Sequence, residues 1–207
     1  MEKVVAQIES KELVQKRHDQ IFKEALKLFS KKGYHRTTMR QIAKATGINL
    51  SYLYKYISSK DDILYLFYHR LHAMFEPIYD EVRSEPGANP ANQLRTLLLK
   101  MLTTIHNNRA AVLTMYTESR HLEPDSLSAV LEKESEMVGV IEELILKGIE
   151  TGDFKTKDPF MAANIIQFLL VIEALRGWNF KNRYSFEEFV ELITEFIMNG
   201  LRAKNSK

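Results

Sequence analysis

Hydroxyl, phenol and basic side chains are concentrated in the segment 50–56. Hydroxyls and phenols can donate hydrogen bonds to phosphate oxygens, and a lysine adds positive charge. A folded protein rarely exposes three phenols within a turn and a half of helix unless the rings contact a partner. These types and spacings are therefore typical of a helix that contacts the major groove of DNA. The residues expected to face outward are Leu50, Ser51, Tyr52, Tyr54, Lys55 and Tyr56.

Two short helices and a turn must position these side chains. Thr38 can cap the first helix, because its side-chain oxygen can accept a hydrogen bond from a free backbone N–H. Gly47 can adopt the positive φ needed where that helix stops, and Asn49 can cap the second helix. Leu53 and Ile57 lie four residues apart and are expected to point inward. The pattern predicts a helix-turn-helix over residues 38–57.

The flanking segments support this interpretation. Upstream, apolar residues at helical spacing predict a helix that ends near Gly33. Downstream, Ser59 can cap another helix, and Asp61 and Asp62 lie in its first turn, where the helix dipole favours anions. Lys60 is unfavourable at that position unless an anion lies nearby. A DNA phosphate would supply that anion.

The segments 29–48 and 53–64 together resemble the TetR/AcrR family of transcriptional repressors. The resemblance extends from about Lys16 to Leu71, and Ile57 stands where the family usually carries phenylalanine. It implies an all-α protein that binds a palindromic DNA operator as a homodimer and is released by a small-molecule effector. The implied domains are an N-terminal extension (1–15), a helix-turn-helix domain (16–71) and a ligand-binding and dimerisation domain (72–207).

The resemblance also implies roles for individual residues in the DNA-binding domain. Three positions correspond to base contacts and four to phosphate contacts. Arginine can bind guanine through two hydrogen bonds, and phenols and lysine can bind phosphate oxygens, so the chemistry agrees with these roles. The base contacts would be Arg40, Ser51 and Tyr52, and the phosphate contacts would be Thr38, Tyr54, Tyr56 and Lys60.

Composition and charge are compatible with such a regulator. Residues 1–70 carry 14 lysines and arginines against 7 acidic residues, whereas the remaining residues carry 15 against 20. The basic N-terminal part is therefore the expected polyanion-binding surface. The chain has no cysteine, no signal-peptide core and no apolar run of membrane-spanning length. We expect a cytoplasmic protein that does not contact a membrane.

Beyond the DNA-binding domain the chain reads as successive helices separated by proline and glycine. The whole sequence predicts nine helices and no strand. A kink or frayed turn is expected near Pro77 in the helix that opens at Ser59. The later helices are expected over about 90–107, 109–121, 158–180 and 185–203, with a long helix that starts at Glu123-Pro124 and is closed by Gly152.

The last two of these helices are apolar around most of their circumference, so both sides must be covered. A second copy of the same pair is the simplest cover and would give a two-fold four-helix interface. The alternative is that both helices lie in the core of a single chain. The candidate interface residues are Ile165, Leu169, Ile172, Ile193, Phe196 and Ile197.

One predicted helical face suggests an effector site. Arg109, Leu113, Tyr116 and Arg120 lie at i, i+4, i+7 and i+11, and two arginines beside an aromatic ring could hold an anion. Methionines such as Met101 and Met115 would adapt to an apolar chain. The segments 115–124 and 149–154 resemble TetR members that sense acyl-CoA thioesters, which implies an acyl-CoA or fatty acid effector. The alternative is a solvated or salt-bridged face, with Arg120 paired to Glu123 or to a neighbouring helix.

Catalytic and metal-binding patterns are weak. The six histidines have no metal-ligand spacing with a carboxylate, and no nucleophile motif or phosphate-binding glycine loop is present. His69 and His72 lie three residues apart but lack a recognisable third ligand, which is usual for surface residues. We expect no catalytic residue, metal or cofactor. The remaining alternatives are a DNA-binding activator, a DNA binder acting through a protein partner, and a small all-helical enzyme.

Overall fold

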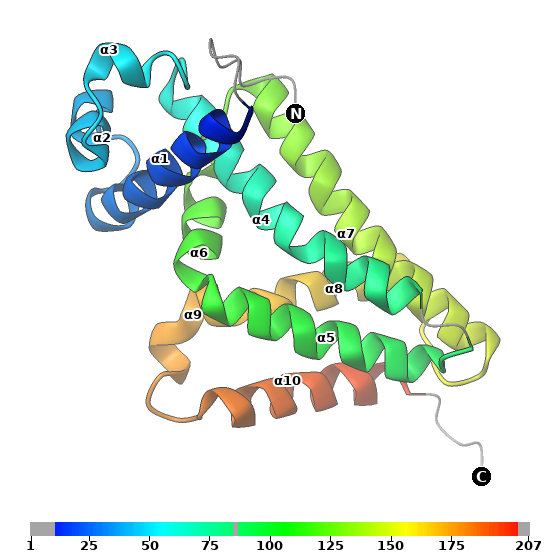
Figure 1. Ribbon diagram of the computed structural model, residues 1–207. Coiled ribbons are helices and arrows are strands. Elements are labelled where there is room, and N and C mark those ends of the chain that lie inside the picture. Colours follow the sequence, from blue (N-terminus) through cyan, green and yellow to red (C-terminus); the bar gives the residue numbers. More distant parts are fainter. Residues whose placement is uncertain (1–10, 85–86, 203–207) are drawn as a thin grey trace. The chain divides into compact units, whose positions relative to one another are not determined.

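A computed structural model describes residues 11–84 and 87–202 of the protein (Figure 1). Within these residues the chain forms ten α-helices and one 3₁₀ helix, which confirms the predicted all-α fold. An isolated antiparallel bridge joins Phe154 to Arg202. The helices are α1 (Lys11–Lys32), α2 (Met39–Thr46), α3 (Leu50–Leu53), α4 (Lys60–Arg83), α5 (Pro90–Asn107), α6 (Arg109–Glu118), η1 (Ser119–His121), α7 (Pro124–Glu150), α8 (Pro159–Leu170), α9 (Ile172–Phe180) and α10 (Phe186–Leu201).

The described chain divides into two compact units. The head unit contains residues 11–71 together with Ala110–Val130. The bundle unit contains the rest of the described chain, from His72 to Arg109 and from Leu131 onward. Helices α4 and α7 contribute residues to both units, and most of α6 belongs to the head unit.

The core of the head unit is built on one face of α1. Ile21, Ala25 and Phe29 are four residues apart, so they lie on one side of the helix, and all three are buried. The Phe29 ring packs against the rings of Tyr34 and Phe67, with centroids 5.3 and 5.9 Å away. The sequence predicted a helix with apolar residues at helical spacing here, and α1 packs against α2.

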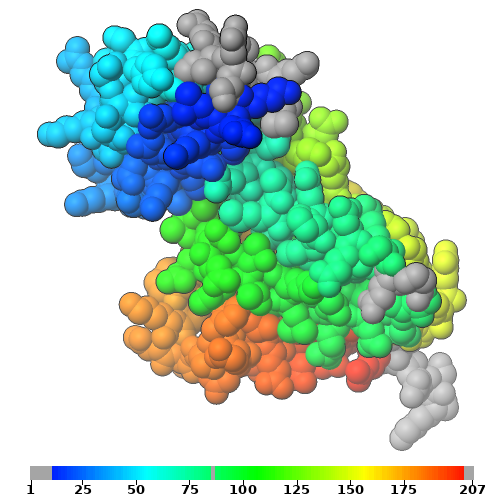
Figure 2. All heavy atoms as spheres, viewed as in Figure 1, coloured from blue at the N-terminus to red at the C-terminus, as the bar shows by residue number. Residues whose placement is uncertain are grey.

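The core of the bundle unit centres on α5. Asn89 caps this helix by accepting hydrogen bonds from the backbone of Ala91 and Asn92, and Pro90 occupies its first position. Helix α10 packs along α5 and can be followed beside it in Figures 1 and 2. The side chains of α5 that fill the core are Leu94, Leu97, Leu98, Met101, Leu102 and Ile105.

A close approach in the bundle unit requires a glycine. A β-carbon on Gly148 of α7 would lie 2.1 Å from the ring of Phe154, which is itself buried. The backbone N–H of Phe154 also donates to the carbonyl of Gly148 at 2.9 Å. The absence of a side chain at Gly148 therefore lets the chain fold back tightly after α7.

The helix predicted over residues 158–180 is two helices. Val171 adopts φ −93° and ψ 0°, and its N–H bonds the carbonyl of Leu169, so the i to i−4 ladder is interrupted there. Helices α8 and α9 consequently bend by 49° at this break. Within the described residues no single helix is long and apolar enough to cross a membrane, and α8 and α9 reach that length and composition only when taken together. In contrast, α4 continues through Pro77 to Arg83.

Candidate nucleic-acid interface and effector domain

The helix-turn-helix of the head unit is held by satisfied caps. The hydroxyl of Thr38 accepts from the N–H of Gln41, and the Gln41 side chain accepts in turn from the N–H of Thr38. Gly47 adopts φ 68° at the end of α2, and the Asn49 side chain accepts from the N–H of Tyr52 at 2.7 Å. The predicted caps and turn are confirmed, so the backbone that carries the polar residues is fixed without DNA.

The predicted base-contacting residues lie at accessible positions. Arg40 on α2 and Ser51 on α3 are exposed, and Tyr52 is partly exposed. Leu53 and Ile57 are buried beneath them, as expected. Their burial anchors the short helix α3 and leaves its outer side free for a partner.

Tyr56 is not at the surface, so the expectation that it faces outward was wrong. Its side chain is fully buried, because the chain leaves the helical path after Leu53 and the α-helical spacing used for the prediction no longer applies. Its hydroxyl donates to the hydroxyl of Tyr52 at 2.9 Å. Burial, followed by this hydrogen bond, raises the pKa of Tyr56. In this conformation Tyr56 supports Tyr52 and does not offer its hydroxyl to a phosphate.

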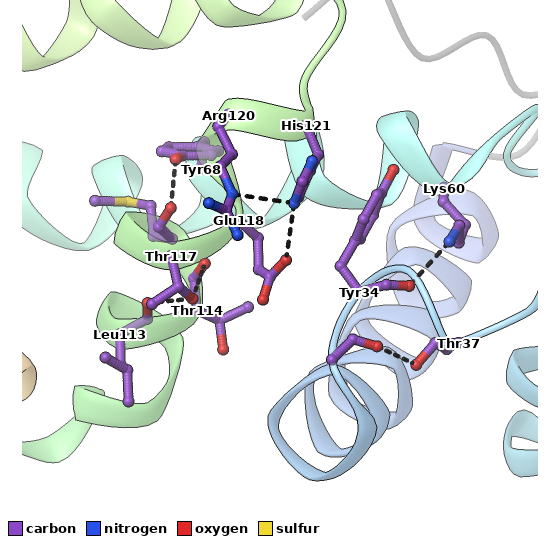
Figure 3. A network of polar contacts seen from close by, with 12 residues as sticks. Tyr34, Thr37, Lys60, Tyr68, Leu113, Thr114, Thr117, Glu118, Arg120 and His121 are labelled. Carbon is purple, nitrogen blue, oxygen red and sulfur yellow. Dashed lines mark hydrogen bonds and ion pairs between the residues drawn. The ribbon is translucent and has the colours of Figure 1, made fainter.

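Two other predicted phosphate contacts lie nearer the surface. Tyr54 is exposed, and Lys60 is partly exposed at the start of α4. The Lys60 ammonium donates to the carbonyl of Tyr34 at 2.9 Å and lies 4.2 Å from the centre of the Tyr34 ring (Figure 3). Burial lowers the pKa of Lys60. Tyr34 therefore compensates the positive charge of Lys60, for which the sequence had suggested a DNA phosphate as the partner.

Sequence reasoning missed the contacts that join α6, η1 and the start of α7 to α4 and to the loop between α1 and α2. The Tyr68 hydroxyl donates to the carbonyl of Met115 at 2.8 Å, and the Tyr34 ring stacks on His121 (Figure 3). Asp61 accepts from the N–H of Glu123 and from the hydroxyl of Ser126, both at 2.8 Å. These partners are 47 to 87 residues apart in sequence, which hides them from local patterns.

The predicted effector residues are divided between the two units. Met101 and Arg109 belong to the bundle unit, whereas Met115 and the remaining members of the predicted face belong to the head unit. Both methionines are buried, and Arg109 is exposed with a hydrogen bond to the carbonyl of His106. The head-unit members of the face are Leu113, Tyr116 and Arg120.

The expected alignment of Arg120 with that face was wrong. Helix α6 ends at Glu118 and continues as the 3₁₀ turn η1, which has three residues per turn, so Arg120 departs from the α-helical register. Its Nε atom donates to Nε2 of His121 at 3.3 Å (Figure 3). Arg120 therefore belongs to the polar network of the head unit.

The predicted dimer residues differ in exposure. Ile165 and Phe196 are more than half exposed, and Leu169, Ile172 and Ile193 are partly exposed. Ile197 was predicted wrongly, because its side chain points into the core of the bundle unit and is only 4% exposed. Sequence reasoning did not select four further exposed apolar residues of α8 and α10. These are Phe160, Met161, Phe168 and Leu192.

Comparison with known proteins identifies both parts of the chain. Residues 87–201 match the family described as "Tetracyclin repressor-like, C-terminal domain". Residues 21–65 match "Bacterial regulatory proteins, tetR family".

Among relatives, the HTH-type transcriptional regulator HbdR of Aromatoleum sp. (strain CIB) is 27% identical over 92% of this chain and 82% of that protein. The fold is similar to that of FadR from Bacillus subtilis, solved with stearoyl-CoA, with a TM-score of 0.72, 19% identity and coverage of 88% and 98% of the two chains. AibR, solved with isovaleryl coenzyme A and operator DNA, gives a TM-score of 0.77, 20% identity and coverage of 87% and 97%.

Proposed function

Because this chain belongs to the tetR family of bacterial regulatory proteins, we propose that it is a repressor that binds a palindromic operator as a homodimer and is released by an acyl-CoA. Membership of this family makes the chain a transcriptional regulator rather than an enzyme. The observation that carries the proposal is the set of accessible polar side chains on α2 and α3, mounted on a capped and anchored backbone.

In this proposal the head unit reads DNA through two groups of side chains. Arg40, Ser51 and Tyr52 contact bases, because they project from α2 and α3 at accessible positions. Tyr54, Thr38 and Lys60 contact phosphates. Lys60 reaches a phosphate by exchanging its hydrogen bond to the Tyr34 carbonyl for a stronger one to an anion. Tyr56 acts indirectly by holding the hydroxyl of Tyr52.

The proposed dimer forms through α8 and α10. Large apolar side chains on these two helices are half exposed or more, and patches of this kind in a single chain mark surfaces that are covered by a partner. A second copy supplies an equivalent pair of helices around a two-fold axis. The same axis would place the two recognition helices about 34–36 Å apart, the spacing of successive major grooves.

The proposed effector is an acyl-CoA whose apolar chain lies in the bundle unit. Two proteins of similar fold, AibR and FadR, were solved with an acyl-CoA, which supports this class. Buried Met101 suits a flexible acyl chain, and exposed Arg109, which follows α5, suits the phosphates of coenzyme A. Binding in the bundle would shift α4, whose other end carries Lys60, and would thereby change the separation of the recognition helices.

The experiment is a fluorescence anisotropy titration against the DNA upstream of the protein's own gene. We expect specific binding of two chains per site, and release by stearoyl-CoA or isovaleryl-CoA but not by free coenzyme A. Operator binding that no acyl-CoA weakens would overturn the effector, and equal affinity for unrelated DNA would overturn the operator assignment. Reporter expression with and without the protein separates repression from activation.

A further inference from the structure

Four polar side chains form a cluster among the core helices of the bundle unit. His72 and Tyr79 lie seven residues apart on one face of α4, Glu134 comes from α7 and Gln167 from α8. Nε2 of Gln167 donates to a carboxylate oxygen of Glu134 at 3.3 Å, and Nε2 of His72 lies 3.8 Å from the other oxygen. The cluster therefore joins three helices through one carboxylate.

The hydrogen-bonding capacity of this cluster is incompletely used. The Tyr79 hydroxyl and the Oε1 atom of Gln167 are buried, and neither has a hydrogen-bond partner in the described protein. Both residues are only 7% exposed, so bulk water does not solvate these atoms. Buried polar atoms without partners are rare and costly, and each of these two atoms can still form a hydrogen bond with a bound group.

An apolar side chain adjoins the cluster. Phe75 lies between His72 and Tyr79 on the same face of α4 and is buried. Burial raises the pKa of Glu134, and burial together with the charge of Glu134 raises the pKa of Tyr79. A negatively charged ligand group would therefore meet an acidic, poorly solvated environment, whereas an uncharged polar group would not.

We propose that His72, Tyr79, Glu134 and Gln167 recognise a hydroxyl group on the acyl part of the effector. A hydroxyl both accepts and donates, so one group can accept from the Tyr79 O–H and donate to Oε1 of Gln167 or to Glu134. A carboxylate cannot donate, and an ammonium cannot accept from Tyr79. This inference rests on the proposed function in that it places an effector in the bundle unit, and it adds the chemistry that selects it.

The test is a comparison of ligands that differ only in polarity. Octanoyl-CoA, 3-hydroxyoctanoyl-CoA and 8-hydroxyoctanoyl-CoA are titrated calorimetrically into the full-length protein, with octan-1-ol, octanoate and octylamine as probes without coenzyme A. We expect at least one hydroxylated probe to bind about threefold to tenfold more tightly than its partner without a hydroxyl, the gain that one neutral hydrogen bond gives. Stronger binding of octanoate or octylamine than of octan-1-ol would overturn the hydroxyl assignment.

The variants Tyr79→Phe and Gln167→Leu test the residues themselves. Each should abolish the preference for the hydroxylated probe, and Tyr79→Phe should leave the melting temperature of the free protein unchanged or higher, because it removes an unpaired buried group. Tyr65→Phe, a change of the same size in the head unit, is the matched control and should leave the preference intact. A preference that survives Tyr79→Phe would overturn the proposal.

Two further outcomes separate this inference from the proposed function. If the cluster holds only ordered water, Tyr79→Phe lowers the melting temperature and all probes bind equally, which overturns the inference but leaves acyl-CoA release of DNA intact. If octan-1-ol shows the Tyr79-dependent preference but no acyl-CoA binds, the inference stands and the acyl-CoA part of the proposed function fails.

Discussion

The head unit and the bundle unit distribute polarity in opposite ways. The head unit exposes polar side chains such as Arg40 and Ser51, and its helix ends are capped by its own residues. The bundle unit exposes large apolar side chains, with Phe196 at 68%, and buries the hydroxyl of Tyr79 without a partner. The polar surface of the head unit is ordinary for a globular protein, whereas the exposed apolar face and the unpaired buried hydroxyl of the bundle unit are not.

This difference has a thermodynamic consequence. Polar groups at the surface are solvated when DNA is absent, so the head unit is stable before it binds. Exposed apolar area and unmatched buried polar groups both raise the free energy of the free bundle unit. The stability of the bundle unit should therefore depend on protein concentration and effector, and that of the head unit should not.

The largest effect is expected from neighbouring substitutions on α10. Phe196→Glu should abolish the dimer, because it places a charge in the apolar face, while the chain remains folded since Phe196 is exposed. Ile197→Glu should unfold the bundle unit instead, because that side chain is only 4% exposed. Sedimentation and circular dichroism measure the two outcomes. If the unmodified protein is monomeric at micromolar concentration, the apolar face of the bundle unit does not bind a second copy.

A second prediction concerns the glycines of α7. Gly148→Ala should destabilise the protein by about 1–3 kcal/mol, because the new methyl group would overlap the Phe154 ring. Gly139→Ala, where a β-carbon meets open space, should instead stabilise α7 by roughly 0.5–1 kcal/mol. Urea unfolding measures both changes. Equal changes in the free energy of unfolding at the two positions would show that the close packing at Gly148 does not disfavour a side chain there.

A third prediction tests base reading by the head unit. Arg40→Ala should cost on the order of 1–3 kcal/mol at one base pair of the operator and relax the preference there. Its melting temperature should stay unchanged, because Arg40 is exposed. Anisotropy with operators altered one base pair at a time gives the measurement. An equal loss of affinity for all of these operators would indicate that Arg40 contacts phosphates and not a base.

A fourth prediction tests phosphate binding by Lys60. Lys60→Ala should weaken binding to every DNA sequence and lower the salt slope by roughly one ion. Lys157→Ala, at an exposed position of the bundle unit, is a control that removes the same charge and should leave the salt slope unchanged. If Lys60→Ala leaves the salt slope unchanged, the lysine serves only to bind the Tyr34 carbonyl.

The smallest effect is expected from surface charge in the bundle unit. The hydrogen bond from Lys147, with a further one from Arg83, lowers the pKa of Glu143 in the folded state. The resulting stability is present above the unfolded pKa, about 4.3, and is lost as the pH falls through the folded value. Because the site is substantially exposed, we expect less than about 1 kcal/mol. Glu143→Gln should remove that part of the pH dependence of unfolding; an unchanged pH profile would contradict it.

Much of the fold follows from local signals. The caps at Thr38 and Asn49 were predicted because each combines a capping residue with helical periodicity immediately after it. The break at Val171 was missed because both sides of it are apolar, so the periodicity continues across the bend. Local patterns predict which residues are helical, but they do not show where the series of backbone hydrogen bonds within a helix is interrupted.

The candidate sites were only partly predictable for the same reason. Exposure of Arg40 and Ser51 follows from the register of a capped helix, whereas burial of Tyr56 depends on how the chain turns after α3. His72 was set aside as a surface histidine, yet it is buried beside Glu134, which lies 62 residues later in the sequence. Contacts over such separations are fixed by tertiary packing and leave no local pattern.

The composition of the head unit limits how this regulator can be recombined with others. A fragment that ends at Leu71 would contain the whole helix-turn-helix but would lack Ala110–Val130. The Tyr68 hydroxyl would lose the Met115 carbonyl, and Asp61 would lose both Glu123 and Ser126. A chimera with a new effector specificity should therefore keep α6, η1 and the start of α7 together with the DNA-binding helices. Two separate segments of the sequence must then be transferred together.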